Sequence, residues 1–429
     1  MEYQPDFWSE DNPARRVIVC ARVAVEVDGH PAALLCRPFQ MPEVVEGVRL
    51  YVESVRPWAV ECGYARLEGF AGDVRIAALD AGKPWGPPDL QFPVPAWRWG
   101  ANPYRNTWNA LVPHNRLYYH RGEDFGALPD RSDVRAVEEG EVTCCPAGHA
   151  VESNRVAIRH PDGRVWSYCH MNAGHLDPAI RPGARVRRGQ VLGKTGCTWG
   201  GRECQWMDPH LHVEFEAGGR TRSAYPFLAQ AYFPACRDSA VAVAGGYAYA
   251  LPGDNIAVDA TRSLARPGAG IASFRWRFHD RSEAAGPRAS IRMTAPGMYA
   301  EELSVVTDDG RETRDILHVR VWDPAAAREC AWGWVFHHPH RGIRAAVPVL
   351  FWNRVVNLRE PARIDYGDGS PTEAIDREAQ HAFPGHGVFT VSVSGTGARG
   401  EPFTQKMPVV VEADAEECGC QVQGERSRS

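Results

Sequence analysis

The sequence predicts an all-β protein made of several small domains in a row, and three observations support this prediction. The chain has 429 residues, too many for one hydrophobic core, and a guide of about 150 residues per domain suggests roughly three domains. Gly and Pro number 41 and 33, which favours turn-rich β structure over helical bundles. Short runs of alternating apolar and polar residues recur along the chain, separated by turn residues, as in antiparallel sheets that bury one face.

The composition excludes several classes of protein. Hydrophobic residues make up 44% of the chain and charged residues 24%, as in an ordinary globular protein. The net charge of −5 gives no reason to expect nucleic acid or an anionic membrane as a partner. No apolar run approaches the roughly 18 residues that would span a bilayer, so we expect no membrane span. The N-terminus is acidic and polar, and no signal peptide is visible in this chain.

The N-terminal part is expected to form a small β-sandwich over residues 17–98, after a flexible arm over residues 1–16. Runs such as "VIVCARVAVEV" and "GVRLYVESV" alternate apolar and polar residues between turns. The following stretch is dense in Pro and Trp. We expect it to be a linker that packs on a neighbouring domain.

From residue 236 the pattern predicts two tandem β modules, at 236–323 and 324–413, and then a tail at 414–429. The first contains "SFRWRF" followed by "APGMYAEELSVV", and the second contains "DYGDGS" followed by "HAFPGHGVFTVSV". Both modules resemble polycystic-kidney-disease (PKD) modules, which are immunoglobulin-like sandwiches. The resemblance implies no catalytic chemistry, and we expect spacers or surfaces for carbohydrate or protein contacts.

The stretch "DPHLHVEFE" at residues 208–216 carries the first candidate metal ligands. Alternation in a strand puts His210, His212, Glu214 and Glu216 on one face, opposite an apolar face that can seal a core. An H-x-H pair alone is weak evidence, since the chain has 16 histidines. A second pair lies in "HHPH" at 337–340; with no supporting residues around it, we expect a solvated loop there.

A second segment supports the pair at 210 and 212. In "YYHRGEDFGA", His120 and Asp124 lie four residues apart. Zinc sites take three protein ligands from His and carboxylates and leave a fourth position for water. His120, Asp124 and one of the two histidines would make such a set, although His120 and Asp124 could also be a plain hydrogen-bonded pair.

Five segments over about residues 112–217 resemble, in order, the lysostaphin-like (LytM-type) zinc endopeptidases of peptidoglycan. They are "HRGEDFG", "VRAVEEGEV", "VAIRHPDGRVWSYCHMN", "RPGARVRRGQVLGKTG" and "PHLHVEFE". The resemblance implies a compact antiparallel sheet within residues 99–235 around one zinc ion per chain. It implies His120, Asp124 and His212 as zinc ligands, and His210 and His170 as unligated catalytic histidines.

These residue types suit the hydrolysis of a peptide bond. Zinc brings the pKa of bound water to about 7, and histidine can act as base or acid near neutral pH. The chain has no H-E-x-x-H glutamate base, and His210 and His170 fill that role. Which of them is the general base stays open, and His170 could also be a hydrogen-bonded core histidine. Glu214 could orient a ligand or simply face solvent.

Residues 197–209 are an insertion relative to the resembling family, with Trp199 and Trp206 available to line a subsite. Cys197 and Cys204 are the best candidates for a local disulfide. A structural zinc site from these two cysteines with His210 and His212 is a competing interpretation, although its spacing differs from the usual C-x2–4-C. A link between Cys330 and the cysteines of the tail is a further candidate. The even total of 12 cysteines fits an oxidising compartment.

The sequence therefore predicts a zinc metalloendopeptidase that is extracellular, periplasmic or associated with the cell envelope. The expected substrate is the peptide part of peptidoglycan, in its cross-links or stem peptides. Two alternatives stay open: a catalytically silent scaffold that binds cell wall or protein, and a zinc endopeptidase that acts on proteins other than the cell wall.

Overall fold

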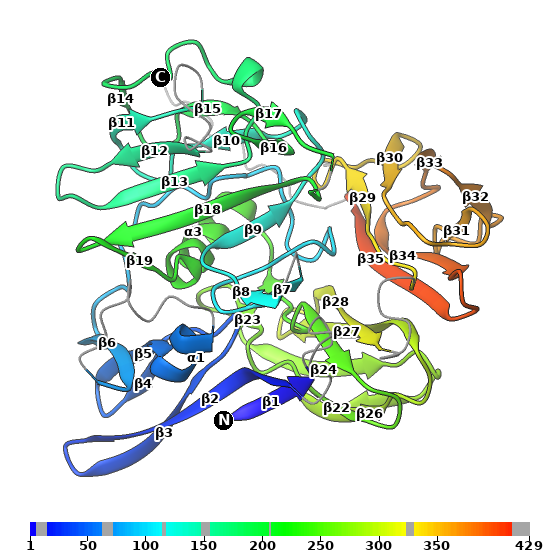
Figure 1. Cartoon of the computed structure of the whole chain (residues 1–429), viewed down its shortest axis with the longest axis horizontal. Helices are drawn as coiled ribbons and strands as arrows, with labels where there is room; N and C mark the ends of the chain where they lie inside the picture. The colour runs from blue at the N-terminus through cyan, green and yellow to red at the C-terminus, as the bar shows by residue number, and fades with distance from the viewer. Residues whose placement is uncertain are drawn as a thin grey trace, which may run out of the picture.

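The computed structural model describes residues 1–5, 15–61, 72–113, 117–146, 155–205, 207–322 and 330–413 (Figure 1). Strands dominate this part of the chain, and the all-β prediction is confirmed. The helical elements within it are α1 (Arg56–Glu61), α3 (Tyr225–Cys236) and the 3-10 turn η1 (Ala173–His175). None of the described helices is long and apolar enough to cross a membrane.

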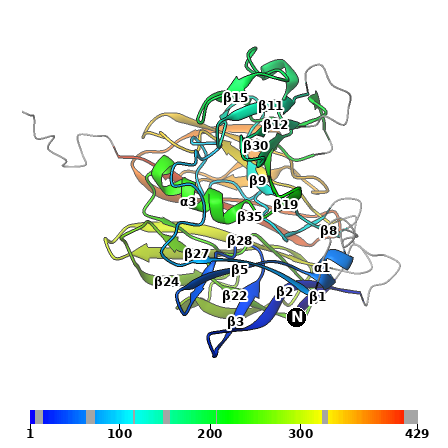
Figure 2. The ribbon, with the colours of Figure 1, turned by 90° about the vertical axis from the view of Figure 1, so that its left-hand side faces the viewer.

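The N-terminal domain consists of two three-stranded antiparallel sheets around a small apolar core. Their strands are β1 (Glu2–Pro5), β2 (Arg16–Val27) and β3 (His30–Cys36), and β4 (Glu43–Val45), β5 (Val48–Val55) and β6 (Val74–Asp80). Residues 2–5 of the expected arm form β1, which pairs with β2, and residues 6–14 of the arm lie outside the described residues. The domain packs beside the first C-terminal module, as Figure 2 shows, and Arg37 Nη1 lies 2.9 Å from Asp259 Oδ2.

The central domain is built on a seven-stranded sheet in which β18 pairs with β13, β9 and β19. The strands of this sheet are β9 (Glu123–Gly126), β11 (Gly140–Cys144), β12 (Arg155–Arg159), β13 (Val165–Cys169), β14 (Arg185–Val186), β18 (His210–Ala217) and β19 (Arg220–Arg222). Short antiparallel pairs flank it: β7 (Leu111–Pro113) with β8 (Leu117–Tyr119), β10 (Asp133–Arg135) with β15 (Val191–Lys194), and β16 (Thr198–Trp199) with β17 (Arg202–Glu203).

The apolar face of β18 seals the core of this domain. Leu211, Val213 and Phe215 are each at most 2% exposed, and helix α3 packs into the same core. The Pro- and Trp-rich stretch adds Phe92 and Trp97 to that core. The polar face of β18 is therefore held on the opposite side, as strand alternation predicts.

Two further β modules follow the central domain. The first contains β20 (Ala240–Val241), β21 (Tyr247–Ala250), β22 (Asn255–Asp259), β23 (Leu264–Ala265), β24 (Ile271–Arg277), β25 (Glu283–Ala285), β26 (Arg288–Arg292), β27 (Gly297–Thr307) and β28 (Glu312–Val321). The second contains β29 (Val335–His338), β30 (Pro348–Asn353), β31 (Ala362–Asp365), β32 (Glu373–Ile375), β33 (Glu378–Ala382), β34 (Gly387–Thr396) and β35 (Pro402–Val411). Each has its own apolar core, and the pairing of Met298 with Phe403 joins β27 to β35, so one sheet continues across both modules.

The prediction of a solvated loop at "HHPH" is wrong. His337 and His340 are 1% and 3% exposed. Asn102 covers them, because its Oδ1 accepts from the backbone N–H of His337 at 3.2 Å and its Nδ2 lies 2.8 Å from His340 Nε2. The second C-terminal module docks on the segment that precedes the central sheet, and this docking buries the histidines.

Candidate metal centre

Strand pairing brings the predicted ligands together from two segments. Strands β9 and β18 are antiparallel, with Asp124 opposite His212 and Gly126 opposite His210. Directly opposed residues share a face of the sheet, so the carboxylate and the imidazole lie side by side. His120 lies just before β9, and its side chain lies on the same face of the sheet as Asp124 and His212. The spacing of four residues in "HRGED" thus places His120 and Asp124 in contact.

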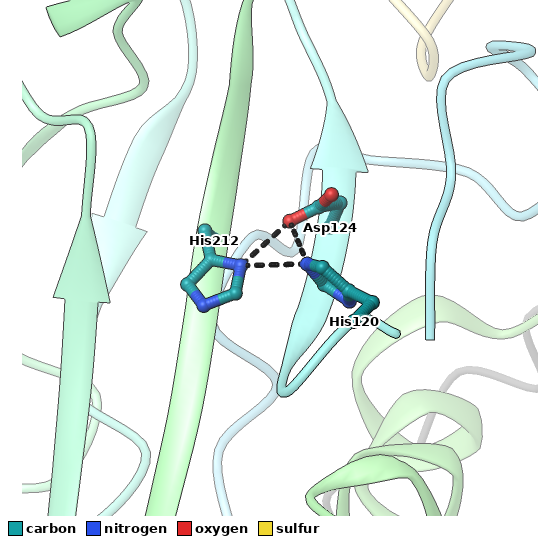
Figure 3. Close-up of side chains that lie close together, drawn as sticks. All are labelled: His120, Asp124 and His212. Carbon is teal, nitrogen blue, oxygen red and sulfur yellow. Dashed lines mark hydrogen bonds and ion pairs between the residues drawn. The ribbon is translucent and has the colours of Figure 1, made fainter. Parts of the chain in front are cut away.

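Three ligand atoms converge at one point (Figure 3). His212 Nδ1 lies 2.8 Å from Asp124 Oδ1, and His120 Nε2 lies 3.1 Å from the same oxygen. The two imidazole nitrogens are 2.9 Å apart. All three atoms lie within 4.8 Å of one another, and they form the metal-ligand group found among the described residues. Two imidazole nitrogens and one carboxylate oxygen are donors that zinc prefers, so the residues fit this metal.

Gly122 makes this close approach possible. A Cβ atom at position 122 would lie 2.7 Å from His212 Cε1 and 2.6 Å from the carbonyl oxygen of Val213. Side chains cannot occupy that space without shifting β18. The glycine in "HRGED" is therefore needed for the chain to cross over the His212 ring.

Two neighbours contact the predicted ligands. Asn106 Nδ2 donates to Asp124 Oδ2 at 2.7 Å, and Glu214 Oε1 lies 3.2 Å from His212 Nε2. Glu214 also lies 3.5 Å from Arg155 Nη1, so its carboxylate contacts both the His212 ring and a cation. The strand pattern already raised Glu214 as a candidate, whereas Asn106 lies in an irregular segment with no sequence signal.

The electrostatics of the group favour a cation. Burial raises the pKa of Asp124, but His120 and His210 outweigh it and hold this pKa well below its ordinary value. Burial lowers the pKa of His212, but its hydrogen bonds to Asp124 and Glu214 outweigh burial and raise the pKa to about 10. The buried carboxylate thus favours a positive charge beside it, and a metal ion held by these residues would replace the proton on His212.

His210 and His170 stand beside the three ligand atoms. Their ring centroids are 4.6 Å apart, and His210 Nε2 lies 3.5 Å from Asp124 Oδ1. His210 Nδ1 lies 2.6 Å from the carbonyl oxygen of Asp208, and His170 Nδ1 lies 3.0 Å from that of Thr198. A carbonyl oxygen only accepts, so Nδ1 donates in both rings and Nε2 is the basic nitrogen.

Burial lowers the pKa of both of these histidines. It is the largest cause that lowers the pKa of His210, and it lowers the pKa of His170 well below its ordinary value. The backbone of His170 is also in the left-handed region, with φ of 67°, which is uncommon for a residue with a side chain. An imidazole whose Nδ1 carries the hydrogen presents Nε2 as its proton-accepting atom.

A pocket of about 580 Å³ opens at this centre. The five predicted residues line one part of it. Aromatic side chains line another part: Tyr104, Tyr118, Trp199, Tyr247, Trp332 and Trp334. The last three of these belong to the two C-terminal modules, which the sequence pattern did not connect to the site.

The insertion at 197–209 forms the β16–β17 hairpin beside the pocket. Trp199 is 49% exposed and lines the pocket, as the sequence suggests, while Trp206 lies outside the described residues. The predicted Cys197–Cys204 disulfide is wrong. Cys197 is a free thiol, and its Sγ lies 3.3 Å from the carbonyl oxygen of Cys204 and 3.0 Å from that of Met207.

The competing zinc site from both cysteines with His210 and His212 is not assembled among the described residues, where the metal-ligand group is His120, Asp124 and His212. The other proposed link, from Cys330 to the tail, involves cysteines outside the described residues.

The structure brings all five predicted site residues to one pocket. His120, Asp124 and His212 form the convergent group, and His170 and His210 lie next to it. Their division into metal ligands and proton-transfer groups remains a prediction, supported by this geometry.

Comparisons with known proteins agree with the class of site. Residues 118–224 match the model of peptidase family M23, and residues 238–321 match the model of the PKD domain. This fold and site define a metallopeptidase domain. The chain carries an M23 peptidase domain of the LytM type followed by a PKD domain, which confirms the resemblance read from the sequence. Whether residues 324–413 form a second PKD-like module stays a prediction.

Three similar solved structures align over parts of the chain. One is a protein from Ruminococcus gnavus described as a "putative glycyl-glycine endopeptidase lytM", at 22% identity and a TM-score of 0.26, covering 34% of this chain and 60% of that one. Another is the antimicrobial peptidase lysostaphin from Staphylococcus simulans, at 14% identity and a TM-score of 0.26, covering 55% of this chain and 94% of that one. The third is the M23 metalloprotease pseudoalterin from the deep sea, at 20% identity and a TM-score of 0.22, covering 31% and 72%.

Proposed function

We propose that this protein is a zinc-dependent endopeptidase that hydrolyses peptide bonds in the cross-links or stem peptides of peptidoglycan. One observation carries the proposal. His120 Nε2, Asp124 Oδ1 and His212 Nδ1 converge in a pocket that is also lined by His170 and His210. The M23 match supports a metal-dependent peptidase domain.

His120, Asp124 and His212 would hold one zinc ion per chain. When bound, zinc supplies Lewis acidity, which lowers the pKa of a water molecule to about 7 and polarises a carbonyl group. Asn106 and Glu214 keep the carboxylate and the imidazole of Asp124 and His212 in their binding orientations through the contacts described above.

His210 and His170 provide the proton transfers. Each presents Nε2 as a basic nitrogen, fixed by the Nδ1 contact to a backbone carbonyl. One ring accepts a proton from the attacking water, and a protonated ring then donates to the leaving amine. A protonated ring also donates a hydrogen bond to the oxyanion that develops on the scissile carbonyl. The two rings have the same tautomer, so either one can serve as the base.

The proposed setting is the cell exterior, the periplasm or the cell envelope, where peptidoglycan is found. The β-sandwich modules would add carbohydrate or protein contacts. A second candidate function is a zinc endopeptidase that acts on proteins other than the cell wall, and the aromatic side of the pocket favours it as a site for larger side chains. A catalytically silent scaffold has less support, because all five site residues are present and assembled.

Three measurements on the full chain test the proposal together. Metal analysis should find one zinc per chain, and the protein should clear a suspension of purified cell walls unless a chelator is present. Mass spectrometry of the products should then show peptide fragments with new amino and carboxyl ends. A metal-free protein that leaves both walls and peptides intact would overturn the proposal and support the scaffold.

A further inference from the structure

The two C-terminal modules supply part of the pocket wall. Tyr247 lies at the start of β21 in the first module, and Trp332 and Trp334 lie just before β29 in the second. All three line the pocket that holds His210 and His212. Figure 1 shows β29 beside the end of β18 where His210 lies. We call Tyr247, Trp332 and Trp334 the aromatic wall.

The rings of the aromatic wall support one another. Trp334 is 1% exposed and stacks on Tyr247, with ring centroids 5.0 Å apart and an angle of 29°. Trp332 meets Trp334 at 5.3 Å and 68°. The Arg320 guanidinium covers Trp332 at 4.4 Å from its ring centroid. The rings therefore form a corner whose shape is set before any ligand arrives.

Hydrogen bonds hold this corner to the peptidase domain. Tyr247 Oη donates to the carbonyl oxygen of Pro103 at 3.2 Å and accepts from the N–H of Arg105 at 3.3 Å. Pro103 and Arg105 flank Tyr104, whose ring lies 4.8 Å from that of His210. The wall and the catalytic histidines thus belong to one packed unit.

The second module also contacts the loop before β18. Arg354 Nη2 donates to the carbonyl oxygen of Gln205, and Arg354 Nε lies 3.9 Å from Asp208 Oδ1. The carbonyl of Asp208 is the one that orients His210. The backbone N–H of Arg354 also donates to the carbonyl oxygen of Trp334 at 2.9 Å, so Arg354 links the aromatic wall to Asp208.

We propose that the aromatic wall is a specificity subsite that accepts a bulky apolar side chain of the substrate, next to the scissile peptide bond. This inference rests on the proposed peptidase function. An aromatic corner removes such a side chain from water on several sides, whereas glycine offers nothing to bury. A stacked sugar ring needs an open flat aromatic face, and Arg320 occupies one face of Trp332, so the corner fits an enclosed side chain better.

The shared chemistry is a peptide bond beside a large apolar side chain, and two sources can supply it. One is a wall peptide in which the aliphatic stem of a long side chain flanks the bond, and the other is an unfolded protein. Digestion of purified peptidoglycan and of an unfolded protein, followed by mapping of the cleaved bonds, distinguishes these sources.

The test uses the full zinc-loaded chain and matched peptides that carry Gly, Leu or Phe on either side of one bond. The wild type should cleave the Leu and Phe peptides with a kcat/KM about 10- to 100-fold above that of the Gly peptide. Trp332→Ala should reduce this ratio to about threefold or less, because the apolar corner is opened. Trp332→Phe should keep most of it, which separates loss of the wall from loss of the fold.

Phe389→Ala is the matched control. Phe389 is a partly buried aromatic residue of the same module that packs on Phe383 and does not line the pocket. Its loss should leave the ratio unchanged. An equal fall of the ratio in Phe389→Ala, an unchanged ratio in Trp332→Ala, or a wild-type preference for Gly would overturn the subsite.

A binding measurement separates this inference from the proposed function. Tryptophan fluorescence measures how tightly the His210→Ala variant binds the Phe and Gly peptides. We expect tighter binding of the Phe peptide. If this preference is found but the wild type cleaves no peptide, the subsite stands and the peptidase proposal fails. If cleavage occurs without any preference, the subsite fails and the peptidase proposal stands. A wall disaccharide is the competitor in a further arm of this measurement. If it competes for the site more strongly than the Phe peptide, and Trp332→Ala abolishes this competition, the aromatic wall binds sugar and the subsite is overturned.

Discussion

Two H-x-H pairs in this chain have opposite surroundings. His210 and His212 lie on a strand beside Asp124, at the mouth of a pocket, with His212 Nδ1 2.8 Å from the carboxylate. His338 and His340 are separated by one proline. The ring of His340 contacts the side-chain amide of Asn102 and not a carboxylate. Burial holds the pKa of His340 well below its ordinary value. The pKa of His212 is instead raised to about 10, because its ring is hydrogen-bonded to Asp124 and Glu214.

The difference shows which neighbour distinguishes the candidate metal site from the other histidine pair. Both pairs are mostly buried, so burial does not distinguish them. A carboxylate from a neighbouring strand does, because it offsets the cost of a buried cation. The segment that supplies this carboxylate, "HRGED", lies 90 residues before His210. The pair at 338 and 340 has no such partner among the metal-ligand groups of the described residues.

The largest expected effect comes from replacing a histidine of the first pair with alanine. The same replacement in the second pair is its control. His212→Ala should lose the zinc and all measurable activity, because it removes one of three ligands. His340→Ala should keep both the zinc and the activity. Metal analysis and peptide cleavage measure the two outcomes. If His340→Ala releases the metal, the assignment of roles to the two pairs is wrong.

A smaller effect is expected at His210, two residues from the ligand on the same strand. His210→Ala should retain zinc but lower kcat by about 10²- to 10⁴-fold, the usual contribution of a proton-transfer group. His170→Ala should behave in the same way. Measuring zinc content and kcat on the same samples tests whether zinc is retained while the rate falls. Loss of zinc from His210→Ala would mean that His210 is itself a ligand.

The residues that orient the ligands should have a weaker effect again. Glu214→Gln removes the charge beside His212, and Asn106→Ala removes the donor to Asp124. Each should lower zinc affinity by about 10- to 100-fold without abolishing it. Titration with a competing chelator gives the affinity. Glu216→Gln is the matched control, since Glu216 contacts Arg155 and no ligand; an equal loss there would argue against an orienting role for Glu214.

The smallest effect concerns stability and the second histidine cluster. Burial lowers the pKa of His337 to about 3, so this ring is neutral in the folded protein but charges near its ordinary pKa of about 6.5 when unfolded. Its contribution is complete above pH 6.5 and is lost as the pH falls from 6.5 toward 3. This loss amounts to about 1.4 kcal/mol of unfolding free energy per pH unit.

His337→Phe should reduce the slope of unfolding free energy against pH by that amount between pH 6 and 4. Urea unfolding at several pH values measures it. The same slope in the wild type and His337→Phe would show that the cluster is not a buried neutral group in solution.

The sequence predicted the parts of the site that depend on one sheet. His120, Asp124 and His212 are brought together by strand alternation and pairing within the peptidase domain, and the ordered segments indicated them. Asn106, Arg354 and the aromatic wall were missed, because their positions depend on irregular segments and on how separate modules dock. The same docking explains why "HHPH" is buried. The Cys197–Cys204 prediction was wrong because proximity in sequence does not determine where a thiol points.

The most direct test of the central claim is to locate the metal by anomalous diffraction at the zinc edge on crystals of the full chain. The account predicts one peak per chain, between His120 Nε2, Asp124 Oδ1 and His212 Nδ1. A peak at Cys197 and Cys204, a peak at the 337–340 cluster, or no peak in zinc-supplied crystals would contradict it.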